Sequence, residues 1–400
     1  MIKFAAFAAI SVFASLSTFA WVSQGDTESD ASAVNVAVSA TVSAGTNSGE
    51  WRSYRGTPDQ RGIASSDLAD KPELQWEFIS PDGWVASCAI AYDRVYAPAL
   101  HGYLHCLDLK TGEELWKYRS IDDPDPKTFA AGFKAAPLVT DTTVYVGDED
   151  GYLHAVDRHT GELQWRFETG AEIAGCVAIY QDTLLLASHD SFLYGLGLDG
   201  KERWKFQTND RVNCSPAVVD HYTFLAGCDE HLRVIDVATG TEFKDIPLES
   251  FLIASPAVVN EQLYVGTHGG DVVSVNWKAG NISWRYTPER LMPFHASAAV
   301  TDELVLVGGH DKQLHAIDRA TGDARWTFET QARIDSSAVV AGDRVFFGSG
   351  DGNIYGLNLA DGRVSWKYNA GKAITAGIAV GQQCLVVGED DRNGRLRCFK

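Results

Sequence analysis

Basic residues are scarce in this chain of 400 residues, in which 34 Lys and Arg stand against 53 Asp and Glu and the formal net charge is −19. This balance excludes nucleic acid as a partner, because such binding depends on neutralising phosphates with Lys and Arg. The sequence also lacks a phosphate-binding glycine loop, a Gly-x-Ser-x-Gly elbow and a His-Glu-x-x-His motif. Helix signals are missing after residue 20. The absences favour an acidic, β-rich protein without a local catalytic motif.

Cysteines number seven, and no two of them are adjacent. An odd count leaves at least one thiol free. When the repeats described below are aligned, only Cys176 and Cys214 are expected to lie close enough to pair, across neighbouring innermost strands. The alternative is that the cysteines are small buried residues in strand interiors. The sequence leaves the state of this pair open.

The uncharged, largely apolar run at residues 4–20 follows Lys3 and ends in Thr18-Phe19-Ala20. This pattern predicts a secretory signal peptide over residues 1–20, with an uncleaved anchor as the alternative because the run is at the short limit for a membrane span. No Cys follows that could be lipidated. Residues 21–50, rich in Ser, Thr, Ala and Gly, are predicted to be a disordered linker. We therefore expect residues 51–400 to be the folded domain of a protein secreted across the inner membrane, in the periplasm or outside.

Internal repeats dominate the remaining chain. Seven stretches share the pattern small-x-Asp/Asn-x-x-Thr-Gly-x-x-x-Trp-x-aromatic, and Lys244 takes the Trp place in the fourth. The repeats are 39–42 residues apart, except for 49 between the first two. The tryptophans of this pattern are Trp116, Trp165, Trp204, Trp284, Trp326 and Trp366. Such a period suits four short strands per repeat.

Each repeat predicts the same antiparallel unit of four strands. In one of them, Ser337–Val340, Val345–Phe347 and Ile354–Asn358 are expected to be the first three strands. The Thr-Gly or Asp-Gly pair then forms a hairpin turn in which Gly adopts positive φ. The Trp follows on the outermost strand, where its ring can cover the seam to the next unit and stabilise it by about 2–3 kcal/mol.

The two ends of the repeat region complement each other. Residues 374–400 supply three strands and stop before a tryptophan, whereas Leu74–Phe78 supplies one strand with Trp76. The sequence therefore predicts an all-β fold, an eight-bladed β-propeller of four-stranded antiparallel blades whose ring is closed by the N-terminal strand. Seven blades would result if one repeat were degenerate.

The repeat resembles the tryptophan-docking repeat of pyrroloquinoline quinone (PQQ) enzymes and of their non-enzymatic, BamB-like relatives in outer-membrane assembly. The stretch from Trp51 to Ala64 is also similar to the lead-in of PQQ-like propeller proteins of planctomycete-type bacteria. The dehydrogenases of this family have a vicinal Cys pair over the quinone, large insertions and a set of calcium ligands. None of these has a match here.

The resemblance is therefore greater to the BamB-like proteins. It implies a monomeric, non-enzymatic binding protein without a cofactor, which engages a protein partner of the cell envelope through its channel face or rim loops. Its contact with the membrane would be peripheral, through a complex. One alternative is a small PQQ-dependent dehydrogenase that oxidises an alcohol or sugar with calcium and with Asp335 as base. Another is a carbohydrate-binding or lyase propeller.

Candidate binding residues fall where each repeat leads into its first strand, at the expected mouth of the central channel. Polar side chains there could form a funnel for an anionic or polyol ligand. The alternative is that they are polar only because a channel mouth is wet. The funnel candidates are Arg211, Asn213, His295, Arg333 and Asp335.

Two further features lie on the same expected face. His189, His268 and His310 occupy one repeat position in the second-to-third turns, with Asp190 and Asp311 beside two of them. Because these turns belong to separate blades, we expect polar turn residues and no metal site. The nine-residue excess after Trp116 contains Asp122, Asp123, Asp125 and Phe129. It lacks the spaced ligands of a calcium loop, and we expect either a rim that contacts a partner or a plain surface loop.

Overall fold

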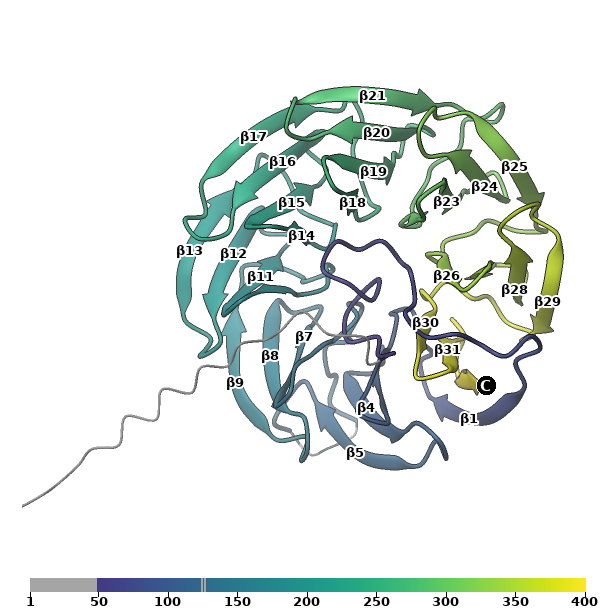
Figure 1. Ribbon diagram of the computed structural model, residues 1–400. Coiled ribbons are helices and arrows are strands. Elements are labelled where there is room, and N and C mark those ends of the chain that lie inside the picture. The colour runs from purple at the N-terminus through teal and green to yellow at the C-terminus, as the bar shows by residue number, and fades with distance from the viewer. Residues whose placement is uncertain (1–48, 124, 126) are drawn as a thin grey trace, which may run out of the picture. The chain divides into compact units, whose positions relative to one another are not determined.

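The computed structural model describes residues 49–123, 125 and 127–400. All strands of these residues lie in eight four-stranded antiparallel sheets, which stand around a common axis as a ring (Figure 1). The predicted eight-bladed propeller is therefore confirmed. The predicted signal peptide and nearly all of the predicted linker lie outside the described residues. Within the described ranges, no helix is long and apolar enough to span a membrane.

Each blade contributes one strand to each of four concentric positions, beginning at the axis. The innermost strands are β2 (Ala89–Ala91), β6 (Leu138–Val139), β10 (Ala178–Tyr180), β14 (Ala217–Val219), β18 (Ala257–Val259), β22 (Ala299–Val300), β26 (Val339–Ala341) and β30 (Ala379–Gly381). The second strands are β3 (Arg94–Pro98), β7 (Thr143–Gly147), β11 (Thr183–Ala187), β15 (Tyr222–Ala226), β19 (Gln262–Gly266), β23 (Leu304–Gly308), β27 (Arg344–Gly348) and β31 (Cys384–Gly388).

The outer half of each blade is longer and ends at solvent. The third strands are β4 (Tyr103–Asp108), β8 (Tyr152–Asp157), β12 (Phe192–Gly197), β16 (His231–Asp236), β20 (Val272–Asn276), β24 (Gln313–Asp318), β28 (Asn353–Asn358) and β32 (Gly394–Phe399). The outermost strands are β5 (Glu114–Arg119), β9 (Leu163–Glu168), β13 (Glu202–Gln207), β17 (Glu242–Pro247), β21 (Asn281–Tyr286), β25 (Ala324–Glu329), β29 (Val364–Asn369) and β1 (Leu74–Ser80).

The ring closes between the two ends of the repeat region. Strand β1 pairs antiparallel with β32, with Trp76 opposite Cys398 and Phe78 opposite Leu396. The eighth sheet thus has the order β1-β32-β31-β30. This confirms that the N-terminal strand completes the last blade, which leaves no unpaired blade edge facing a gap in the ring.

The repeated tryptophans hold neighbouring blades together. Trp326 donates its indole N–H to the carbonyl oxygen of Leu359 in the next blade, at 2.9 Å. Its ring lies on Gly362, where φ is +69° and a Cβ would fall 2.6 Å from the ring. Glycine is therefore required both by the backbone and by the docked ring. The same indole bond joins Trp76 to Leu109, Trp116 to Arg158, Trp165 to Leu198, Trp204 to Val237, Trp284 to Arg319 and Trp366 to Pro72.

The seam between blades 4 and 5 is built differently. Lys244 occupies the Trp place and lies over Gly280. Trp277 of blade 5 supplies the missing aromatic ring instead: it is 1% exposed, and its ring packs against Phe224 at 5.1 Å and Tyr222 at 5.4 Å between centroids. The degenerate repeat is therefore compensated from the neighbouring blade.

Residues 49–64 form a segment, the plug, that runs around the inside of the ring at one end (Figure 1). Its backbone bonds in ring order to the innermost strands of blades 1, 2, 4, 5, 6 and 7: Trp51 to Ile90, Arg52 to Val139, Pro58 to Val218, Asp59 to Val258, Arg61 to Val300 and Gly62 to Val340. Trp51 and Arg55 are 1% and 2% exposed. Burial lowers the pKa of Arg55 to about 10, and its guanidinium donates to the carbonyl of Ala298 at 2.8 Å. The plug covers one end of the central channel, the end at which the first strand of each blade turns into the second.

Side-chain hydroxyls and one thiol link the blades deeper along the axis. The backbone N–H of Ser255 donates to the Ser297 hydroxyl, and that of Ser297 donates to the Ser337 hydroxyl, each at 2.9 Å. Further links run from Ala136 to the Cys176 sulfur, from Cys176 to Ser215 and from Ser215 to Ser255. Tyr54 of the plug contacts the hydroxyls of Ser297 and Ser337 at 3.0 and 3.1 Å. Small polar side chains in the lead-in segments therefore satisfy buried backbone groups around the axis.

Candidate functional site

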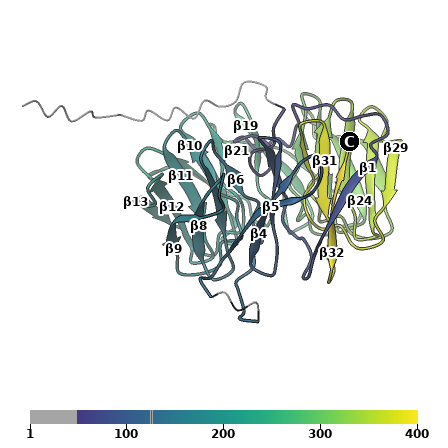
Figure 2. The same ribbon diagram turned by 90° about the horizontal axis from the view of Figure 1, so that it is seen from below.

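We define the channel face as the face that carries the second-to-third turns and the connections between blades. Figure 2 shows the connection after β5 projecting from this face, at the end opposite the 49–73 segment. In blades 2 to 8 the turn on this face bonds to the lead-in segment of its own blade; for example, His268 N–H donates to Phe251 O and His310 N–H to Pro293 O. The turn also receives the lead-in of the next blade, since Phe294 N–H donates to Thr267 O. These turns are thus held between two lead-in segments.

This packing gathers three of the funnel candidates and two of the turn histidines. His268 Nδ1 and His295 Nε2 share a hydrogen bond of 3.1 Å. The rings of His295 and His310 meet edge to face at 4.2 Å between centroids. His310 Nε2 donates to Asp335 Oδ1 at 2.7 Å, and Arg333 Nε donates to Asp335 Oδ2 at 2.7 Å. We call this set the histidine arc: His268, His295, His310, Arg333 and Asp335.

The arc is partly shielded from solvent. The side chains of His310 and Asp335 are 13% and 18% exposed, whereas that of Arg333 is 61% exposed. Burial, and then the neighbouring His310, lower the pKa of His295 to about 4. Its imidazole is therefore neutral at neutral pH. Phe251 stacks on His268 at 4.1 Å between centroids. The imidazoles are held in fixed planes and open toward the channel face.

The other funnel candidates lie elsewhere on the face. Asn213 donates to the Cys228 sulfur at 2.9 Å, and the backbone carbonyl of Arg211 accepts from Cys228 N–H. Lys134, also in a lead-in segment, pairs with Glu149 at 2.6 Å and Glu172 at 3.2 Å. The predicted funnel is thus divided into separate polar groups around the ring. Whether these groups bind a ligand stays a prediction.

The three turn histidines do share one position, but they have different neighbours. His189 faces Glu172 at 3.7 Å, whereas His268 and His310 both contact His295. The aspartates beside them serve the fold: Asp311 accepts from His315 in β24, and Asp190 accepts from the Tyr194 hydroxyl in β12. The sequence alignment located the histidines but could not show that a lead-in residue of the next blade would connect two of them.

The insertion between β5 and β6 is held by Arg119. Its guanidinium donates to the carbonyls of Asp123, Asp125 and Thr128, and Thr128 donates its hydroxyl to Asp123 at 2.8 Å. Asp122 lies 3.9 Å from Arg166 in the next blade. Phe129 is 75% exposed. The sequence-predicted rim residues are therefore brought together in one loop that presents an aromatic ring to solvent.

A second apolar projection was not predicted from the sequence. Leu291 and Met292, in the connection between β21 and β22, are 62% and 42% exposed. They lie against Gly270 of the second-to-third turn in blade 5, and so on the channel face. The stretch Glu289–Pro293 carries a usable signal, because the two large apolar residues Leu291 and Met292 follow the charged pair Glu289-Arg290 in a connection between blades.

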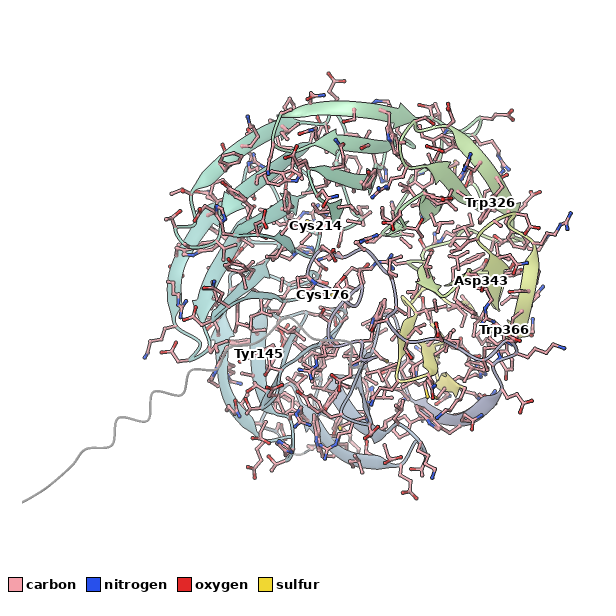
Figure 3. The ribbon with its side chains drawn as sticks, viewed as in Figure 1. Tyr145, Cys176, Cys214, Trp326, Asp343 and Trp366 are labelled. Atoms are coloured by element: carbon pink, nitrogen blue, oxygen red, sulfur yellow. The ribbon has the colours of Figure 1, made fainter. Side chains whose placement is uncertain are left out.

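All seven cysteines are free thiols, including Cys176 and Cys214 (Figure 3). The sulfurs of this pair accept from different backbone groups, Ala136 N–H and Ala226 N–H. All cysteines except Cys228 are buried, as the alternative interpretation predicted. The thiols of Cys384 and Cys398, on paired strands, contact each other. The hydrogen bond between them, together with burial, raises the pKa of Cys398.

A cleft of about 750 Å³ opens between blades 6 and 7 at the opposite end, beside the plug. Its walls include Arg61, Trp326, Leu359 and Asp343, and Figure 3 shows Trp326 and Asp343 on that side of the ring. It adjoins the docked tryptophan rather than the histidine arc.

Comparison with known proteins places this propeller in a family. The sequence model described as "Outer membrane protein assembly factor BamB" matches residues 51–197, 149–292 and 288–396. The chain belongs to this BamB family of PQQ-like repeat propellers. The crystal structure of BamB from Moraxella catarrhalis has a TM-score of 0.69 and 18% identity, with 82% of this chain and 97% of that chain covered.

Other similar proteins have different roles. Quinohemoprotein alcohol dehydrogenase from Comamonas testosteroni has a TM-score of 0.76 at 12% identity and covers 89% of this chain and 81% of its own. Beta-alanine-activating enzymes of Homo sapiens and Mus musculus are 27% identical over 113 residues, which is 26% of this chain. The match spans a tenth of the length of these enzymes. At such identities the structural likeness establishes the fold alone.

Proposed function

We propose that this BamB-family propeller is a non-enzymatic, extracytoplasmic binding protein that holds a protein partner of the cell envelope on its channel face. The family match over nearly the whole described chain is the observation that carries this proposal. The family is named after BamB, an outer membrane protein assembly factor.

The channel face offers side chains that protein partners bury. Phe129, Leu291 and Met292 project from two connections of this face and are 75%, 62% and 42% exposed. Aromatic residues and Met are enriched in the cores of protein interfaces. Lys134 lies in the connection that carries Phe129, and His295 of the histidine arc lies in the connection that carries Leu291 and Met292. Apolar anchors beside polar groups form the pattern of a transient interface.

The alternative is a PQQ-dependent dehydrogenase, as the fold of the quinohemoprotein suggests. The residues around Asp335 fit calcium poorly, because calcium takes about six to eight oxygen ligands. Here both carboxylate oxygens of Asp335 are engaged by Arg333 and His310, and imidazoles fill the space beside it. The proposed function therefore includes no PQQ chemistry at Asp335.

Photo-crosslinking tests the proposed partner surface. A photoreactive residue replaces Phe129 or Met292 in separate variants, and Asp343, whose side chain is 95% exposed beside the plug, is the matched control on the opposite face. The expected result is a discrete adduct with an envelope protein from the two channel-face positions only. Equal adducts from all three positions, or adducts from Asp343 alone, would contradict the proposal.

A further inference from the structure

The histidine arc has the donor set of a transition-metal site. His295, His310 and Asp335 each offer one ligand atom, and these atoms all lie within 4.8 Å of one another. They come from two consecutive lead-in segments and the turn held between them, so their backbones are fixed by the blades rather than by a loose loop. We propose that His295, His310 and Asp335 bind one divalent transition-metal ion of the zinc type on the channel face.

The chemistry of the donors selects the class of ion. Two imidazoles and one carboxylate suit zinc, which binds His nitrogen at about 2.0–2.1 Å and carboxylate oxygen at about 2.0–2.2 Å. Such bonds place neighbouring ligand atoms of a tetrahedral site about 3.3 Å apart. His310 Nε2 and Asp335 Oδ1 are already 2.7 Å apart.

The surrounding residues orient the ligands. A metal-binding His usually engages its other ring nitrogen with a polar partner. His268 Nδ1 meets His295 Nε2 at 3.1 Å, which leaves His295 Nδ1 for the ion. Arg333 holds Asp335 Oδ2 at 2.7 Å, so Oδ1, which accepts from His310 Nε2 when no ion is bound, is the oxygen that would turn to the ion. His268 and Arg333 are therefore positioning residues: His268 contacts His295 Nε2 and Arg333 contacts Asp335 Oδ2, the two atoms that do not bind the ion.

Three protein ligands leave the fourth tetrahedral position open. Sites of this kind accept water or an incoming ligand at that position. The histidine arc opens toward the channel face, and the ligand side chains of His310 and Asp335 are 13% and 18% exposed. An ion there is reachable from solvent while most of its shell is supplied by the protein. The site goes beyond the proposed partner binding and does not depend on it.

Metal titration of the purified full chain, produced without a histidine tag and freed of metal by chelation, tests the assignment. Zinc binding is followed by calorimetry, and cobalt is followed by the visible absorption that intensifies in tetrahedral coordination. The expected result is one equivalent of bound metal. His310→Ala and Asp335→Asn should each weaken zinc binding by at least about a hundredfold, and His268→Ala by about 10–100-fold.

His189→Ala is the matched control, because His189 has the same turn position in blade 3 but contacts Glu172 instead. It should bind zinc as the parent does. Circular dichroism melts confirm that each variant is folded, and the isosteric Asp335→Asn change keeps the test valid if His310→Ala is unstable. Absence of stoichiometric binding by the parent, or equal binding by parent, His310→Ala and Asp335→Asn, would overturn the proposal.

Discussion

Replacing one docking tryptophan tests how the ring is held together. Trp326→Ala removes a half-buried ring that lies on Gly362 and loses the 2.9 Å indole bond to Leu359. Truncating a fully buried Trp costs about 3–5 kcal/mol of unfolding free energy. A typical hydrogen bond accounts for about 1 kcal/mol of such a loss. Because the Trp326 ring is only partly buried, we expect the free energy of unfolding to fall by about 2–4 kcal/mol.

Lys244→Ala is a matched control that the chain itself provides. Lys244 has the same repeat position in blade 4, but the seam there is filled by Trp277. Its truncation should lower the free energy of unfolding by less than about 1 kcal/mol. Trp326→Phe should give an intermediate loss, since it keeps an aromatic ring and loses the indole bond.

Equilibrium urea unfolding, followed by both circular dichroism and tryptophan fluorescence, measures these differences. Coincident transitions and reversibility are checked first, because a ring of repeats can depart from two-state unfolding. If Trp326→Ala lowered the unfolding midpoint no more than Lys244→Ala does, tryptophan docking would not stabilise the seams, and the reasoning would be refuted.

Three further predictions concern the plug, the compensated seam and the thiols. Gly62→Ala should lower the melting temperature, because φ is +67° and a Cβ would fall 2.0 Å from the buried Arg55 guanidinium; Gly371→Ala, with φ +90° but nothing within 4 Å, is the control that isolates the clash. Trp277→Ala should destabilise the chain by about 3–5 kcal/mol in urea unfolding because its ring is 1% exposed, and a loss as small as that of Lys244→Ala would contradict the proposed compensation. A thiol reagent should modify Cys228 first under native conditions, since the other six cysteines are buried and burial raises the pKa of Cys106 to about 12 and of Cys176 to about 11. Rapid modification of several thiols, mapped by mass spectrometry, would count against this prediction.

The repeats made the fold predictable because each carries its own local signals. The Gly of each turn and the Trp four residues later fix one hairpin and one seam, and Trp76, together with the strand that the last repeat lacks, identifies the strand that closes the ring. Blade 4 is predictable even though Lys244 replaces its Trp, because the strand pattern around that position persists. The repeat period and the turn residues are therefore sufficient to predict the propeller architecture.

The plug and the histidine arc depend on contacts that no local pattern encodes. Residues 49–64 do not follow the repeat, and their backbone bonds to innermost strands arise only once the ring has formed. Alignment placed His268 and His310 at one turn position and His295 at a lead-in position. It could not show that each turn packs between two lead-in segments and so joins these residues. Side-chain convergence between blades is a property of the assembled ring.

Titration of the purified full chain with PQQ, with and without calcium, tests the central claim most directly. Binding is followed spectroscopically, and turnover is followed by dye-linked oxidation of alcohols and sugars. A binding protein whose channel face holds a protein partner should show neither stoichiometric PQQ binding nor oxidation at high micromolar cofactor. Stoichiometric binding with turnover that is lost in Asp335→Asn would contradict the account and make the channel face an active site.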